Sequence, residues 1–410
     1  MGRFLFVLSF ILSCLPVPAQ QQELSVRQAV ERALASHPLL DSAASRLDIA
    51  GAAKTQAGLG LNPRLVLQHE NSRPGSSAHP FVHYRDTDQF AYLQQTLEIG
   101  GKRDKRVALA ESGRQRTDLE RSLLRQQITA RVSQAYWAAL GANRLHALLV
   151  QSAVNLRGIV EYHEVRVKEG ALAEADLIRV RVEAQRLNVD INHAFLASER
   201  ARIHLFREMG QREFPAVQFT DTVEGALADP IPADVNVALA ERAEIKVARA
   251  QAEHARAQQT LQTALATPNV DVLFGLKRTA GFNTVVGGVQ WDLPLRNRNE
   301  GNIASAVAEI RLAESNLAAA EALVRAEFEA AVSAYNLHRR DVVTFLEPLQ
   351  LQAGESHRIA EAAYREGGAD LLRLLDSQRM GIESRILYIE GLTEVRVAQS
   401  ELQAAMGVQP

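Results

Sequence analysis

Proline is nearly absent from the long central stretches of this 410-residue chain. The interval between Pro80 and Pro215 contains none, and after Pro294 only Pro348 precedes the final residue. Helix interiors exclude proline because it lacks an amide donor and its ring clashes with the preceding turn. Ordinary domains punctuate their turns with proline and glycine far more often. The spacing therefore predicts a mainly α-helical chain made of a few very long helices.

The chain also contains two copies of one pattern. Ala33–Ala35 recurs as Ala238–Ala240, and each triplet opens an alanine-rich run that ends at a proline, Pro63 or Pro268. The later landmarks recur in the same order, and they are Leu97 with Leu293, Tyr136 with Tyr335, Gly170 with Gly367, and Gly210 with Gly407. Repetition of this kind marks a duplicated structural unit. Chance similarity between alanine-rich helices would not reproduce the matched prolines and hairpins.

Each copy reads as helix, β-hairpin, long helix, turn and long helix. The first copy, 20–210, has a helix near 24–60, strands at about 63–71 and 89–98, and long helices at about 102–168 and 172–209. The second copy, 234–410, has a helix near 234–266, strands at about 269–277 and 284–294, and long helices at about 299–365 and 370–406. The segment 211–233 between them is expected to be a linker. A helix of about 67 residues is about 100 Å long, so a coiled-coil-like array is expected rather than a compact globule.

The segments after Pro268 alternate between apolar and polar residues with a period of two. The apolar face comprises Val270, Val272, Phe274 and Leu276 on the first strand and Val285, Val289, Trp291 and Leu293 on the returning strand. Alternation over about nine to eleven residues is typical of transmembrane barrel strands. The alternative is a pair of amphipathic hairpins packed on a soluble core. Four strands cannot close a barrel and leave exposed edges, whereas three chains would supply twelve strands.

Residues 1–19 are typical of a secretory signal peptide. Arg3 provides the positive charge, and the apolar stretch 4–15 is too short to span a bilayer. The pattern favours cleavage after Ala19, and the alternative is lipoprotein processing at Cys14. An exported chain without a membrane helix is periplasmic, secreted or a membrane β-barrel.

Four short motifs lie at the expected strand–helix junctions and around the second helical turn, and they are Leu97–Arg103, Leu293–Asn299, Tyr364–Gly367 and Leu374–Arg379. Together with the duplicated plan, they resemble the TolC-like outer-membrane efflux factors, and in particular their heavy-metal (CzcC-like) subgroup. The resemblance implies a homotrimer with a twelve-stranded β-barrel in the cell outer membrane, surrounded by its lipid and continued by a long periplasmic α-helical tunnel. It also implies a passive exit duct that a periplasmic adaptor joins to an inner-membrane pump of the resistance-nodulation-division type. Heavy-metal cations are the expected cargo, and drugs, solvents or secreted peptides are the alternatives.

The resemblance also assigns roles to particular residues. The adaptor would contact two turns, formed by Lys168, Glu169, Gly170 and Ala171 in the first copy and by Arg365, Glu366, Gly367 and Gly368 in the second. Arg373 and Asp376 match two positions whose rings constrict the tunnel in the family's best-known member, where both are acidic. Gly100, Gly101 and Pro294 mark the strand–helix junctions. In the alternative interpretation, the turn glycines serve only as helix caps, and Arg373 and Asp376 lie on solvated outer faces.

Composition and motif content exclude several other classes of protein. A net charge of −2 is unlike a strongly basic nucleic-acid binder, and a single cysteine excludes a disulfide framework or a cysteine-rich zinc site. The histidines form no H-E-x-x-H motif: His79 and His83 lie in a loop, and His338 occupies a heptad position where packing is expected rather than metal binding. No P-loop or G-x-S-x-G motif is present. The sequence therefore predicts no enzyme, no cofactor, no resident metal and no nucleic-acid partner, and it leaves a periplasmic adaptor or a soluble coiled-coil scaffold as the less favoured alternatives.

Overall fold

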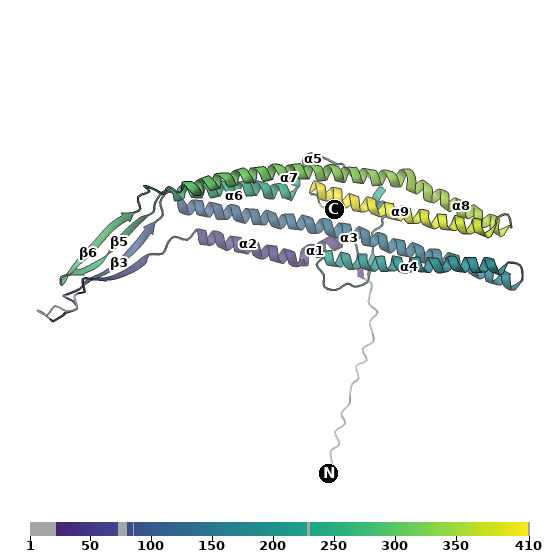
Figure 1. Cartoon of the computed structure of the whole chain (residues 1–410), viewed down its shortest axis with the longest axis horizontal. Coiled ribbons are helices and arrows are strands. Elements are labelled where there is room, and N and C mark those ends of the chain that lie inside the picture. The colour runs from purple at the N-terminus through teal and green to yellow at the C-terminus, as the bar shows by residue number, and fades with distance from the viewer. Residues whose placement is uncertain (1–21, 73–79, 85, 228–229, 409–410) are drawn as a thin grey trace, which may run out of the picture.

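The protein is an elongated rod of helices, with a β-sheet at one end and two helical turns at the other (Figure 1). The computed structural model describes residues 22–72, 80–84, 86–227 and 230–408, so the expected signal peptide, Cys14 and His79 lie outside the described residues. None of the helices in these ranges combines the length and the hydropathy of a membrane-spanning helix.

Two helical hairpins form the end of the rod that is distant from the sheet (Figure 1). In the first, α3 (Lys102–Lys168) turns back as α4 (Glu174–Glu208). In the second, α8 (Glu347–Arg365) turns back as α9 (Leu371–Met406). The 67 residues of α3 match the long helix expected over 102–168.

A π-helical turn interrupts the second long helix, for which the sequence predicts a continuous helix over 299–365. α7 (Glu300–Asp341) ends at the five-residue turn Val342–Leu346, and α8 begins directly after it. The turn places Pro348 in the first turn of α8, where a missing amide donor costs least. Packing also fixes the turn, because a Cβ atom on Gly391 of α9 would lie 2.5 Å from Cδ1 of Leu346.

The shorter helices are broken at corresponding residues of the two copies, whereas the sequence predicts single helices over 24–60 and 234–266. The observed helices are α1 (Val26–Ser36), α2 (Pro38–Ala57), α5 (Val235–Glu241) and α6 (Ala243–Leu265). His37 and Arg242 separate them, and both have extended backbone with ψ of 124°. Pro38 explains the first break, because the residue before a proline avoids the helical conformation. The second break has no proline, so local helix signals do not reveal it.

Side-chain contacts account for the break at Arg242. This residue is 8% exposed, and its guanidinium donates to Glu244, at 2.8 Å, and to Glu327, at 2.6 Å. Gly407, which ends α9, packs against the extended backbone, since a Cβ atom there would lie 3.1 Å from the Arg242 nitrogen. In the first copy Gly210 packs against the side chains at the break, since a Cβ atom there would lie 2.9 Å from Cδ2 of His37 and from Cδ of Pro38. Each copy therefore folds its last glycine onto its own helix break.

The sheet contains four antiparallel strands in the order β2-β3-β5-β6. They are β2 (Arg64–Glu70), β3 (Asp88–Leu97), β5 (Val270–Thr279) and β6 (Phe282–Trp291). β3 pairs with β5, so the two hairpins form one sheet, and β2 and β6 lie at its edges. The register confirms the predicted alternation, because Leu65, Leu93 and Phe274 lie opposite one another on neighbouring strands and all three are exposed.

The central core joins the helices to a second, much smaller sheet. β1 (Gln22–Leu24) pairs in parallel with β4 (Val217–Phe219), which lies within the expected linker 211–233. Tyr136 of α3 is fully buried, packs edge-to-face on Trp137 and Phe219 with ring centroids 5.3 Å apart, and donates its hydroxyl hydrogen to the carbonyl of Leu24 at 2.9 Å. This tyrosine therefore anchors the linker to the middle of the rod.

Candidate channel constriction and helical tips

Arg373 and Asp376 lie on one exposed face of α9, close to its start. They are three residues apart, which places them one turn from each other on the same side of the helix. Both line a hollow of about 680 Å³ between α8 and α9, together with Glu355. No ion pair joins either side chain to another residue in the described ranges. The positive charge of Arg373 and the negative charge of Asp376 thus both face solvent at the hollow between α8 and α9.

Both helical tips have the hydrogen bonds of a Schellman motif. At the first tip, the amide of Ala171 donates to the carbonyl of Arg166 at 2.8 Å, and that of Gly170 donates to Val167 at 2.9 Å. The second tip repeats the pattern, with Gly368 donating to Ala363 at 2.8 Å. The glycines have φ of 73° and 78°, a region that L-residues with a Cβ atom rarely adopt. All eight residues expected at the tips are exposed: Lys168, Glu169, Gly170, Ala171, Arg365, Glu366, Gly367 and Gly368.

A buried histidine–tyrosine contact joins the two hairpins just behind the tips. His163 of α3 is fully buried, and its Nδ1 lies 2.8 Å from the carbonyl of Ile159. Because a carbonyl only accepts, Nδ1 carries the hydrogen, and Nε2 accepts from the hydroxyl of Tyr364 at 2.7 Å. The two rings are stacked with centroids 5.8 Å apart. Burial raises the pKa of Tyr364, which keeps its hydroxyl protonated as the donor.

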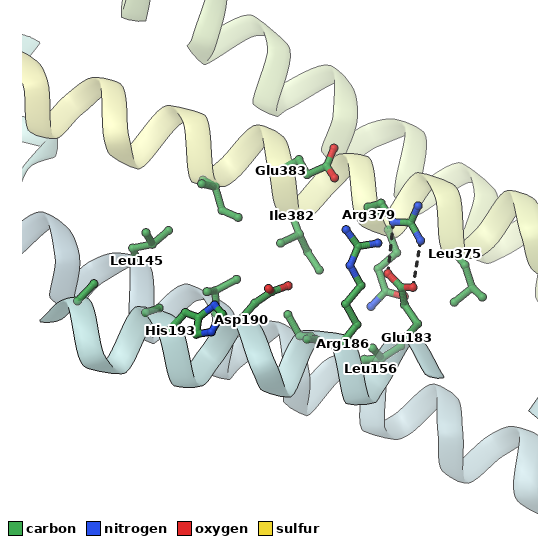
Figure 2. Close-up of a pocket in the computed structure, with 16 residues that line it drawn as sticks. Leu145, Leu156, Glu183, Arg186, Asp190, His193, Leu375, Arg379, Ile382 and Glu383 are labelled. Carbon is green, nitrogen blue, oxygen red and sulfur yellow. Dashed lines mark hydrogen bonds and ion pairs between the residues drawn. The ribbon is translucent and has the colours of Figure 1, made fainter. Parts of the chain in front are cut away.

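An ion pair also crosses between the hairpins, from α4 to α9. Figure 2 shows Glu183 and Arg379 pointing toward each other across a hollow of about 400 Å³. The guanidinium nitrogens of Arg379 lie 3.0 and 3.3 Å from the carboxylate oxygens. Leu156, Leu187 and Leu375 form part of the apolar lining of this hollow. This pair could not be predicted from the sequence, because its members are 196 positions apart and each lies on an ordinary amphipathic helix.

The strand–helix junctions are held by polar contacts. Gly100 and Gly101, between β3 and α3, have φ of 77° and 69°, and Asn299, the N-cap residue just before α7, has a comparable φ of 63°. Arg106 donates to Glu98 at 2.5 Å and to the carbonyl of Ala57 at 3.0 Å, so it ties β3 to the end of α2. The hydrogen bond from Arg106 lowers the pKa of Glu98. In the second copy, the carbonyl of Pro294, which is exposed, accepts from Arg298 at 3.3 Å.

The histidines do not gather at one site. Within the described ranges, no group of three or more histidine, cysteine, aspartate or glutamate side chains is placed to hold a metal ion. His338 is about one-third exposed rather than covered by neighbours, and its Nδ1 lies 3.1 Å from the carboxylate of Glu394. His83 stacks on His69, with ring centroids 4.9 Å apart.

Comparison with known proteins places these features in a family. The family model described as "Outer membrane efflux protein" matches residues 29–211 and 235–408. The chain is 24% identical over 387 residues to the cobalt-zinc-cadmium resistance protein CzcC of Cupriavidus metallidurans, an alignment that covers 94% of this chain and 90% of the relative. It is 25% identical over 300 residues to the nickel-cobalt-cadmium resistance protein NccC of Alcaligenes xylosoxydans xylosoxydans, covering 70% and 65% of the two chains. Its fold is similar to the open state of the MtrE outer membrane channel of Neisseria gonorrhoeae, with a TM-score of 0.76, 17% identity, and 94% and 89% of the two chains covered. Because the family model matches most of the chain in two successive segments, the protein belongs to the outer membrane efflux protein family.

Proposed function

We propose that the protein is the outer-membrane exit duct of a tripartite efflux system. It works as a homotrimer and passively conducts substrate from an inner-membrane pump, through a periplasmic adaptor, to the outside of the cell. The observation that carries this proposal is the four-stranded sheet at the end of the helical rod. Its apolar face is exposed and both of its edges lack a partner among the described residues. Three chains would pair those edges into twelve strands and place the apolar face in lipid.

The tunnel of this duct narrows at Arg373 and Asp376. A threefold axis beside α9 brings three copies of each side chain together in two rings, about one helical turn apart. Rings of opposite charge attract each other across that turn, and salt screens the attraction. Support for this placement comes from the exposure of both side chains, neither of which forms an ion pair with another described residue of the chain.

Single-channel recording in planar bilayers tests the constriction. Asp376→Ala is expected to raise conductance and weaken cation preference, because it removes the acidic ring. Arg373→Ala is expected to raise cation preference. Glu383→Ala is the matched control, since this exposed carboxylate of α9 lines the hollow facing α4 instead. If both test variants match the unmodified protein in conductance and reversal potential, the constriction lies elsewhere.

The two exposed tips are the docking points for the adaptor. Their tight Schellman turns present a small, defined surface at the end of the rod that is opposite the sheet. The adaptor docks with the tips of its own helical hairpins, and the pump is of the resistance-nodulation-division type.

Divalent heavy-metal cations are the proposed cargo. Support comes from the two relatives, which are named as resistance proteins for cobalt, zinc, cadmium and nickel. Deletion of the gene should sensitise cells to these cations more than to drugs or organic solvents, and the plasmid-borne gene should restore resistance. Sensitivity to drugs alone would assign the duct to another pump. Cell fractionation provides the independent check, because a soluble periplasmic monomer would contradict the duct itself.

A further inference from the structure

A polar row crosses the sheet at the end that is distant from the helices. The register places His69, Gln89, Arg278 and Asn283 opposite one another on the four successive strands. Because side chains alternate between faces, this row shares its face with the apolar residues one step closer to the helices. Those neighbours are Leu67, Ala91, Leu276 and Val285.

The row lies at the outer limit of the apolar face. Val270 and Trp291 form the row at the opposite limit, next to the helices. Arg278 is eight positions after Val270 on β5, which is about 26 Å along the strand at roughly 3.3 Å per residue and about 20 Å of height for a strand tilted by about 40°. A barrel's apolar band is about 25 Å tall. On the proposed placement of this sheet in the outer membrane, on which this inference rests, the row meets the headgroups of the outer leaflet.

Arg278 is held in place by ring stacking rather than by an acid. Its guanidinium lies 5.2 Å from the centre of the Tyr84 ring. Tyr84 packs edge-to-face on His83, which in turn stacks on His69. No ion pair joins Arg278 to any residue in the described ranges, and its buried Nε has no hydrogen-bond partner there. The cation is therefore oriented but not neutralised.

Two acidic residues of the strands at this end of the sheet lie on its other face. Glu70 and Asp88 are directly opposite each other in the register, on the face away from Arg278. Asp88 is also engaged, since it accepts from the side chain of Asn71 and from the amide of Ala280. The outer-facing row is thus cationic and amide-rich, and it borders a hollow of about 670 Å³.

We propose that this row binds the phosphate group of a phosphorylated glycolipid in the outer leaflet. The Arg278 guanidinium donates two parallel hydrogen bonds to phosphate oxygens, which is the geometry that arginine offers and lysine does not. The side-chain amides of Gln89 and Asn283 donate from either side. The acyl chains of the same lipid lie on Leu67, Leu276 and Val285 below the row. Contact with both parts of the molecule distinguishes a lipid from free phosphate.

Native mass spectrometry of the purified full-length protein in detergent tests this site. The probes are diphosphorylated lipid A, the same lipid after removal of its phosphates, and sodium phosphate. We expect the protein to bind the phosphorylated lipid at least about tenfold more tightly than the dephosphorylated one, which is the scale of one charge-assisted hydrogen bond. Arg278→Ala should remove this preference, and Arg278→Lys should retain part of it. Arg64→Ala is the matched control, because Arg64 lies in the same sheet but on the opposite face and at the inner end.

The outcomes separate this inference from the proposed function. If Arg278→Ala keeps the phosphate preference, or if Arg64→Ala loses it equally, the site is wrong. Binding of sodium phosphate as tight as that of the lipid would also overturn it, since the acyl contacts would then contribute nothing. Fractionation of the same cells reports on the duct independently. If the unmodified protein is in the outer membrane but shows no preference for the phosphorylated lipid, only the lipid site is refuted. If the protein is absent from the outer membrane, both the lipid site and the exit duct are refuted.

Discussion

Two glycines of α3 should respond in opposite directions to the same substitution. Gly141 faces α9, where an added Cβ atom would lie 2.3 Å from Oγ1, 2.5 Å from Cγ2 and 2.9 Å from Cβ of Thr393. Thr393 cannot easily rotate away, because its branched side chain is stiff and its hydroxyl donates to the carbonyl of Ile389 at 2.7 Å. Gly158 lies in the same helix with no atom within 4 Å of an added Cβ.

The magnitudes follow from two competing effects. Replacing glycine by alanine inside a helix stabilises by roughly 0.5–1 kcal/mol. Overpacking a close helix contact costs about 1–3 kcal/mol. Gly158→Ala should therefore raise the free energy of unfolding by up to about 1 kcal/mol. The free energy of unfolding of Gly141→Ala should be about 1–3 kcal/mol lower than that of Gly158→Ala.

Thermal unfolding of the purified variants, followed by circular dichroism at 222 nm, measures this difference. Thr393→Ala removes the two atoms that lie nearest to the added Cβ atom at position 141. The double variant with Gly141→Ala should therefore recover much of the stability that Gly141→Ala alone loses, which is a positive coupling between contacting residues. Equal midpoints for Gly141→Ala and Gly158→Ala would show that α3 and α9 do not approach as closely as the structure has them.

Three further outcomes are expected. Gly367→Trp should abolish efflux while trimers still assemble on gels, because the strain at its positive φ and the added bulk are confined to an exposed turn with open space around it; normal resistance, or loss of trimers together with efflux, would speak against adaptor docking there. Tyr364→Phe leaves the buried Nε2 of His163 without a donor at a cost of about 1–3 kcal/mol, so amide exchange should accelerate at both tips, and unchanged protection would contradict this. Burial lowers the pKa of His254 and His357 in the folded chain, whereas the unfolded chain takes up protons near pH 6.5. Stability should thus be lost as the pH falls below about 6.5; His254→Gln should lessen that loss, and an unchanged pH profile would refute the assignment.

The long helices and the strands were predictable because their signals are local. A proline-free run specifies α3, and the glycine that ends it provides the left-handed residue of the Schellman turn. Period-two alternation specifies the faces of β5 and β6, and the observed register agrees. The tip residues could also be located, since glycine at the end of a helix is itself a local signal.

The breaks and cross-links were not predictable because they depend on contacts between distant segments. The helix breaks at Arg242, where contacts with Glu244, Glu327 and the end of α9 stabilise the extended backbone, and no proline in the sequence marks this break. The stacking of His163 on Tyr364 joins residues 201 positions apart. β1 and β4 have three residues each, too few for a periodic pattern. The constriction at Arg373 and Asp376 stays a prediction, because it depends on neighbouring chains.

The edges at β2 and β6, which have no partner strand in the described part of the chain, also govern the kinetics of membrane entry. Hydrocarbon offers no partner to a backbone amide or carbonyl, so a lone sheet cannot cross lipid cheaply. Insertion therefore requires that another chain has first paired with each edge. The rate at which protein enters the membrane should then depend on the concentration of chains with an order greater than one. At low synthesis rates the chains should spend longer with their apolar face uncovered, where chaperones and proteases compete for them. The yield of working ducts then depends on how fast the gene is expressed as well as on how stable the finished assembly is.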